Sequence, residues 1–187
     1  MNPPITFRER TAADEPLLFN LFAEAKGMEL ALLGLSAEQL QPLLEMQFRG
    51  RQMTYAARYH GAWDAVIERD SVGVGRLLVD RGRDHWRLID IGLLAHFRGH
   101  GIGSHALRMC QKQCGELGIP LRLCVTSGNP ARMLYERLGF AAVPQPTEAP
   151  QAAGHPLPNL DQEMEWRPTR IPAAGTKAAI EESRRIA

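Results

Sequence analysis

The sequence predicts an α/β sandwich, in which a mixed, mostly antiparallel sheet of about seven strands is flanked by helices. Three observations predict this fold class. Short segments alternate apolar and polar residues, as half-buried strands do. Longer segments repeat apolar residues three and four positions apart, as amphipathic helices do. Strands and helices do not alternate one by one, which excludes a regular doubly wound parallel array.

Composition restricts the class of protein. The chain has 187 residues, of which 44% are hydrophobic and 23% charged, and these values are ordinary for one globular domain. Its formal net charge of +1 provides no basic face for nucleic acid. No apolar run approaches the roughly 18–20 residues that span a bilayer. The N-terminus has prolines and charges where a signal peptide carries an apolar core. We therefore expect a cytoplasmic protein that binds neither nucleic acid nor membrane.

The N-terminal third is expected to hold one strand and two helices. Ile5–Thr11 alternates as a strand does. Residues 12–32 have helical spacing, with Pro16 in the first turn. A second helix is expected from Ser36 to Met53, because Ser36 and Gln39 match a capping box.

Three strands and a helix are expected in the middle of the chain. Residues 62–69 and 72–80 alternate on either side of a short turn, which predicts a hairpin. Residues 86–94 form the most apolar of the three runs, so this strand is expected to be the most central. A helical face then runs from Ile102 to Leu117, and Gly118 ends it.

The last third contains shorter elements and a proline-rich segment. We expect a strand, a short helix and two further strands, at residues 121–126, 127–139, 140–143 and 161–166. Residues 144–159 hold five prolines, which predicts a long loop. The expected domain is therefore 1–166, with this loop inside it. Residues 167–187 are expected to be a C-terminal tail that includes a short helix.

The cysteines do not form a disulfide pattern. There are three, an odd number. Cys110 and Cys114 lie four residues apart and so share one face of the predicted helix. They are either half of a metal site, with His105 as the nearest third ligand, or small apolar groups packed on the sheet. Packing is the interpretation we favour, and we predict no metal.

Three glycines at alternate positions, Gly99, Gly101 and Gly103, separate the central strand from the helix that follows. Glycine permits positive φ and lets a ligand approach the backbone. Successive N–H groups and the helix N-terminus can then hold an anion, usually a phosphate. A Walker loop needs a lysine that is absent before Ser104, and the spacing fits a dinucleotide fingerprint poorly. A nucleotide-binding regulatory domain is therefore a weak hypothesis.

The segment Arg98-Gly99-His100-Gly101-Ile102-Gly103 resembles the Arg/Gln-x-x-Gly-x-Gly/Ala signature of the GNAT superfamily of N-acetyltransferases. Residues 129–140, "NPARMLYERLGF", resemble the second hallmark of that superfamily. The resemblance covers roughly residues 5 to 166. It implies acetyl-coenzyme A as co-substrate, with the pyrophosphate held at Arg98, Gly99, His100, Gly101, Ile102, Gly103 and Ser104.

The resemblance also implies roles for residues outside the turn. Backbone groups near Leu93 and Leu94 would hold the pantetheine arm and polarise the thioester carbonyl. Tyr135 would be the general acid for the departing thiolate; alternatively its ring packs on the sheet. Asn129 would bond the cofactor arm, or else only cap the following helix.

The general base is open. Family members that carry a glutamate on the strand at residues 121–126 differ from this chain, which has no carboxylate there. Asp90, in the central strand, is either a base or a structural aspartate bonded to backbone or to an arginine. Glu29 and Tyr55, in the region that forms the acceptor wall in the family, are further candidates. Water can also deprotonate an amine.

The leading hypothesis is thus transfer of an acetyl group to a primary amine of a small molecule. A protein N-terminus is the less favoured acceptor, because the strand position often acidic in protein N-terminal acetylators is apolar here. The alternative from a different class is a non-catalytic acyl-coenzyme A-binding module for sensing or assembly. Dimers are common in the superfamily, so a homodimer is a further expectation by analogy.

Overall fold

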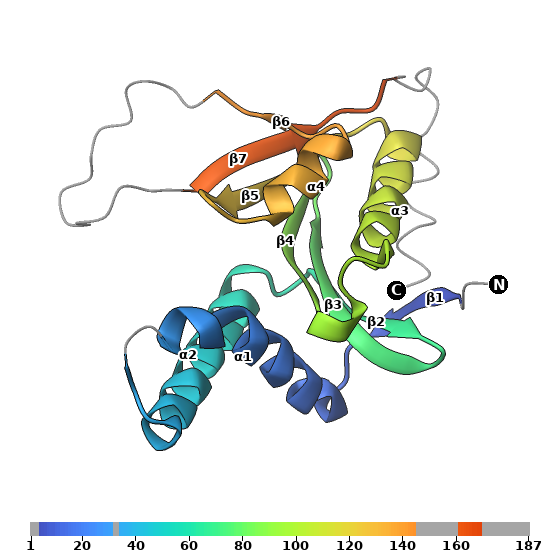
Figure 1. The fold of residues 1–187 in the computed structure, drawn as a ribbon. Coiled ribbons are helices and arrows are strands. Elements are labelled where there is room, and N and C mark those ends of the chain that lie inside the picture. The colour runs from blue at the N-terminus through green and yellow to red at the C-terminus, as the bar shows by residue number, and fades with distance from the viewer. Residues whose placement is uncertain (1–3, 32–33, 145–160, 170–187) are drawn as a thin grey trace. The chain divides into compact units, whose positions relative to one another are not determined.

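The structure is a computed structural model and describes residues 4–31, 34–144 and 161–169. Its helices and strands follow one another in the predicted order (Figure 1). The elements are β1 Ile5–Glu9, η1 Ala12–Asp14, α1 Glu15–Ala31, α2 Ala37–Arg58, β2 Trp63–Arg69, β3 Val72–Arg81, β4 Trp86–Leu93, η2 Ala95–Phe97, α3 Ile102–Leu117, β5 Leu121–Thr126, α4 Ala131–Arg137, β6 Ala141–Ala142 and β7 Asp161–Trp166.

The strands form one seven-stranded sheet in the order β1-β2-β3-β4-β5-β7-β6. The apolar strand β4 is fourth in this order, as its sequence predicts. Its pairing with β5 is parallel, whereas β1–β2, β2–β3, β5–β7 and β6–β7 pair antiparallel. The sheet is therefore mixed and mostly antiparallel, which confirms the predicted fold class.

The first two helices differ from their predicted bounds. Residues 12–14 form a separate 3-10 turn, so α1 starts at Glu15. Asp14 explains this turn, because its carboxylate accepts from the Thr11 N–H at 2.7 Å and from Arg8 at 2.6 Å. The second helix begins at Ala37, directly after its N-cap Ser36, and Ser36 and Gln39 bond reciprocally in the predicted capping box. It ends at Arg58, five residues beyond the predicted end.

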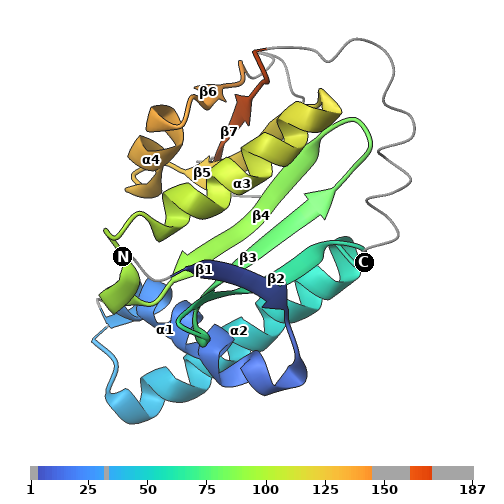
Figure 2. The ribbon, with the colours of Figure 1, turned by 90° about the vertical axis from the view of Figure 1, so that its right-hand side faces the viewer.

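Contacts divide the chain into two compact units, of which the first comprises residues 1–81 and 89–106. In it, α1 and α2 pack together beside the strands β1 to β3 (Figure 2). Their shared core contains Leu18, Leu21, Phe22, Leu30, Leu44 and Phe48. Leu94, just after β4, packs against this cluster. The two helices thus reach the chain segment that leads into the glycine turn.

The second unit comprises residues 82–88 and 107–187. Its core includes Cys110 and Cys114 of α3 and Leu121 and Leu123 of β5, all at most 1% exposed. The Gln111 amide donates to the Leu138 carbonyl at 2.8 Å and so joins α3 to the end of α4.

Two predicted features fall largely on residues outside the described part of the chain. These are the proline-rich loop of 144–159 and the helical tail beyond Thr169. Within the described ranges, none of the helices combines the length and the apolar character that crossing a bilayer requires.

Candidate functional site

The glycine turn joins η2 to α3 in the first unit. Gly99 has φ of 78° and Gly101 has φ of 79°, a left-handed conformation that favours glycine. A Cβ atom built at either position would meet no atom within 4 Å. Backbone strain rather than crowding therefore selects glycine, and the space over the turn is open to a ligand.

Helix α3 begins directly after the turn and has 16 residues. Its first backbone bond runs from the His105 N–H to the Gly101 carbonyl at 2.9 Å. The N–H groups of Ile102, Gly103 and Ser104 precede that bond, and such N–H groups have no partner within a helix. Ile102 is only 2% exposed and anchors the helix start. This arrangement suits an anion, because N–H groups and the positive end of the helix dipole converge there.

Arg98 is held by the protein itself. Its Nε donates to the Leu93 carbonyl at 2.8 Å, and its terminal nitrogen donates to Glu24 of α1 at 3.1 Å. The same Glu24 oxygen accepts the Ala95 N–H at 2.7 Å. The His100 ring nitrogen lies 2.9 Å from the Arg98 carbonyl. Arg98 therefore fixes the turn against α1, a role that its position in the sequence does not reveal.

The end of β4 approaches β3 closely. A Cβ atom at Gly75 would lie 2.5 Å from the Gly92 carbonyl oxygen and 2.6 Å from the Leu93 side chain, so only glycine fits there. The Leu94 N–H donates to the Val74 carbonyl at 3.0 Å. The ladder between β4 and β5 ends at Leu88, five residues before Leu93.

Asp90 lies between two guanidinium groups. One carboxylate oxygen is 2.7 Å from Arg51 of α2, and the other is 3.6 Å from Arg76 of β3. Arg76, whose side chain is 5% exposed, also makes two bonds of 2.8 Å to Asp64. These contacts correspond to the structural interpretation of Asp90, an aspartate bonded to arginine. The sequence could not identify the partners, because one comes from the strand β3 and the other from the helix α2.

Tyr55 belongs to the same network. The Arg51 Nε donates to its hydroxyl at 2.8 Å. Burial, reinforced by the negative charge of Asp90, raises the pKa of the Tyr55 hydroxyl, which therefore stays protonated at neutral pH. Burial acts to lower the pKa of Arg51, but attraction to Asp90 and Tyr55 outweighs it and the pKa is raised. Glu29, the other acceptor-wall candidate, lies in α1, and its side chain is outside the described part of the structure.

The remaining predicted residues lie in the second unit. Tyr135 of α4 is 7% exposed, and its ring packs edge-on against Phe140 at 5.9 Å between centroids. The Asn129 side chain accepts the Ala131 N–H at 2.9 Å, as a helix cap does. The Asn129 contact matches its capping interpretation, whereas the Tyr135 ring packs on Phe140, which lies between α4 and β6 rather than in a strand. Their proposed roles toward a cofactor stay predictions.

A carboxylate missed by the sequence reasoning lies next to β5. Glu163 of β7 pairs in register with Cys124. Its carboxylate accepts from Arg87 of β4 at 2.8 Å. The antiparallel pairing of β7 with β5 therefore supplies an acidic group beside the strand that lacks one. Only the register of β7, which follows the proline-rich segment, places it there.

Cys110 and Cys114 share one face of α3, and both are 0% exposed, as small packed groups are. His105 instead stacks on Phe7 of β1, with ring centroids 6.2 Å apart. Among the described residues, no group of three or more His, Cys, Asp or Glu is arranged to hold a metal ion.

Comparison with known proteins gives one family match. The family model described as "Acetyltransferase (GNAT) family" matches residues 31–140, a range that includes β4, the glycine turn and α4. No curated protein matches the chain by sequence.

Solved structures share the fold at low sequence identity. The PaiA N-acetyltransferase of Thermoplasma acidophilum, in complex with coenzyme A, is 18% identical with a TM-score of 0.61, covering 88% of this chain and 99% of its own. An acetyltransferase of Thermus thermophilus is 20% identical with a TM-score of 0.61, at 89% and 99% coverage. The ribosomal-protein-alanine N-acetyltransferase of Escherichia coli is 16% identical with a TM-score of 0.58, at 93% and 98% coverage.

Proposed function

The chain belongs to the acetyltransferase (GNAT) family, and from that premise we propose that it moves an acetyl group from acetyl-coenzyme A to a primary amine of a small molecule. Family membership implies acetyltransferase activity. The observation that carries the proposal is the turn at Gly99 and Gly101, with its positive φ angles and its open space above the backbone.

The turn suits a pyrophosphate. Its two left-handed glycines are exposed, and the N–H groups of Ile102, Gly103 and Ser104 follow at the start of α3. Backbone donors and a helix dipole bind phosphate without any lysine. In this proposal Arg98 positions the turn through Glu24, and the backbone near Leu93 and Leu94 holds the pantetheine arm and polarises the thioester carbonyl.

We assign the proton donor for the departing thiolate to Tyr135. A phenol has an unperturbed pKa near 10 and is therefore protonated at neutral pH, as a general acid must be. The support is its match to the family motif. Asn129, which caps α4, is proposed to bond the cofactor arm as well.

The base is proposed to be water rather than a side chain. Asp90 was the candidate on β4, but both of its oxygens face arginines. The carboxylate is therefore engaged in ion pairs within the protein. We propose that Asp90 fixes Arg51 and Tyr55, and that the amine releases its proton to solvent before attack.

A small-molecule acceptor is favoured over a protein N-terminus because β5 is apolar at the buried position Leu123, 1% exposed. The test is release of the coenzyme A thiol with a panel of small primary amines and, in parallel, with peptides that have free N-termini. Turnover restricted to small amines supports the proposal. Turnover restricted to peptides contradicts the acceptor class.

The same assay distinguishes the alternative from a different class. If the protein binds acetyl-coenzyme A and no amine or peptide is acetylated above the amine-free rate, it is a non-catalytic acyl-coenzyme A-binding module.

A further inference from the structure

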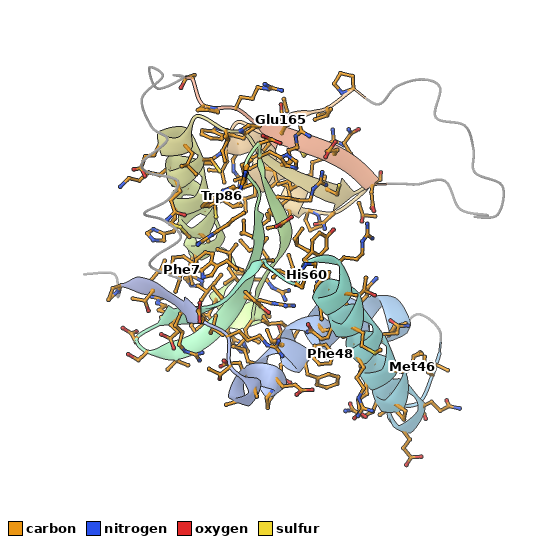
Figure 3. All side chains as sticks on the ribbon, turned by 180° about the vertical axis from the view of Figure 1, so that it is seen from behind. Phe7, Met46, Phe48, His60, Trp86 and Glu165 are labelled. Atoms are coloured by element: carbon orange, nitrogen blue, oxygen red, sulfur yellow. The ribbon has the colours of Figure 1, made fainter. Side chains whose placement is uncertain are left out.

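Helix α2 is apolar on two opposite faces. Its inner face carries Leu44 and Phe48, 6% and 4% exposed, which pack in the core shared with α1. Its outer face carries Met46 and Met53, 64% and 73% exposed. Figure 3 shows Met46 and Phe48 on opposite sides of the helix. A helix that is apolar on both faces normally has both covered.

The outer face is a continuous stripe, which we define as Pro42, Met46, Gly50, Met53 and Ala57. All five residues are exposed, and their spacing keeps them on one side of the helix. The stripe is about 22 Å long at 1.5 Å per residue. A Cβ atom at Gly50 would meet no atom within 4 Å, so another helix can approach closely at the middle of the stripe.

A shallow groove with both apolar and charged lining lies between η1, the start of α1 and α2, next to the stripe. It has a volume of about 510 Å³, and its lining includes Phe19 and Phe48 with Glu45 and Arg49. The two phenylalanine rings meet edge-on at 5.5 Å.

We propose that the stripe is a self-association surface, on which α2 of a second copy packs antiparallel about a two-fold axis. The axis passes between residues 49 and 50. Met46 of one copy then lies opposite Met53 of the other, and Pro42 lies opposite Ala57. A two-fold contact uses the same patch on both copies and closes at a dimer.

The charges beside the stripe favour this occupant. Glu38 and Glu45 lie in the N-terminal half of α2, and Arg49 and Arg58 lie toward its C-terminal half. Antiparallel pairing sets the acidic half of each helix against the basic half of the other, and it also opposes the helix dipoles. The flanks of the stripe carry both acidic and basic residues. A lipid surface binds helices with basic flanks, so a membrane is the less favoured partner.

The pair Glu45–Arg49 is the charged contact that the dimer changes most. Within one copy its atoms are 3.9 Å apart, and the side chains are 45% and 75% exposed. Such an exposed pair contributes little on its own. Near the two-fold axis, Arg49 lies opposite residue 50 of the other copy and so about 7.5 Å along the helix from its Glu45, a distance that the two long side chains can span. Because a single-helix interface is small, we expect a dissociation constant on the order of micromolar or weaker.

The test is sedimentation velocity of the full chain over a concentration series, with the thermal midpoint of each variant as a folding control. Wild type is expected to dimerise, and the double substitution M46E/M53E is expected to weaken the dimer at least about tenfold. Met133 of α4, 65% exposed, provides the matched control, and Met133→Glu should leave the dimer unchanged.

Charge reversal supplies an independent test. Glu45→Arg and Arg49→Glu are each expected to weaken the dimer severalfold, and the double variant is expected to recover it, because complementarity across the axis is restored. A wild-type chain that stays monomeric at every concentration would overturn the proposal. So would a dimer that M46E/M53E leaves intact.

Discussion

Gly101→Glu is the substitution whose effect follows most directly from the geometry of the turn. The open space at Gly101 accommodates the new side chain, but the φ of 79° costs any residue with a Cβ about 1–2 kcal/mol. This cost falls on stability. The added carboxylate would stand among the N–H groups that we assign to the pyrophosphate.

The loss of affinity can be worked from electrostatics. A negative charge at about 5 Å from a phosphate charge costs about 1–3 kcal/mol for effective dielectric constants between those of water and a protein surface. With two phosphate charges and partial screening, we expect about 2–4 kcal/mol. Binding of acetyl-coenzyme A should therefore weaken about 30- to 1,000-fold.

Isothermal titration calorimetry of Gly101→Glu against Gly101→Gln measures this loss. Glutamine has the same size and the same backbone strain but no charge, so it should weaken binding far less. Higher salt should reduce the difference between the two variants, because it screens charge. Equal affinities for the two variants would contradict the pyrophosphate assignment, since a charge at the turn would then have no effect on binding.

Three other perturbations test separate parts of the structure. Tyr135→Phe should lower turnover at least tenfold and leave acetyl-coenzyme A affinity nearly unchanged; full activity would restrict Tyr135 to packing. Asp90→Asn should reduce the free energy of unfolding in urea by about 1–3 kcal/mol, because it removes the negative charge that faces both Arg51 and Arg76; an unchanged midpoint would contradict the network. Arg8 holds the pKa of Asp14 well below its usual value, so this pair stabilises the fold above about pH 4 and ceases to do so as pH falls. Asp14→Asn should accordingly flatten the loss of stability below pH 4, and a parallel acid curve would contradict that assignment.

Local chemistry made much of the fold predictable. Ser36 and Gln39 bond reciprocally within four residues, so the start of α2 is visible in the sequence. The end of α2 is not. Around Met53 the inner face is held by Arg51 and Tyr55, through the hydrogen bond between them and the ion pair of Arg51 with Asp90. The spacing of apolar residues does not predict such polar contacts, so it does not predict where α2 ends.

The candidate site also has one part that the sequence predicts and another that it does not. The turn at Gly99 and Gly101 depends on local backbone conformation, and glycine spacing reveals it. The contact of Arg98 with Glu24 joins residues 74 positions apart. Likewise Glu163 reaches β5 only through strand pairing. Contacts of this kind require the three-dimensional arrangement, because neither partner has a distinctive sequence environment.

Calorimetric titration of the purified protein with acetyl-coenzyme A, coenzyme A and ATP tests whether the glycine turn is a coenzyme A site. We expect both coenzyme A species to bind and ATP to give no heat, because the turn and the end of β4 together recognise pyrophosphate and pantetheine. If neither coenzyme A species gave a heat of binding, the glycine turn would not be a coenzyme A site and would bind another ligand.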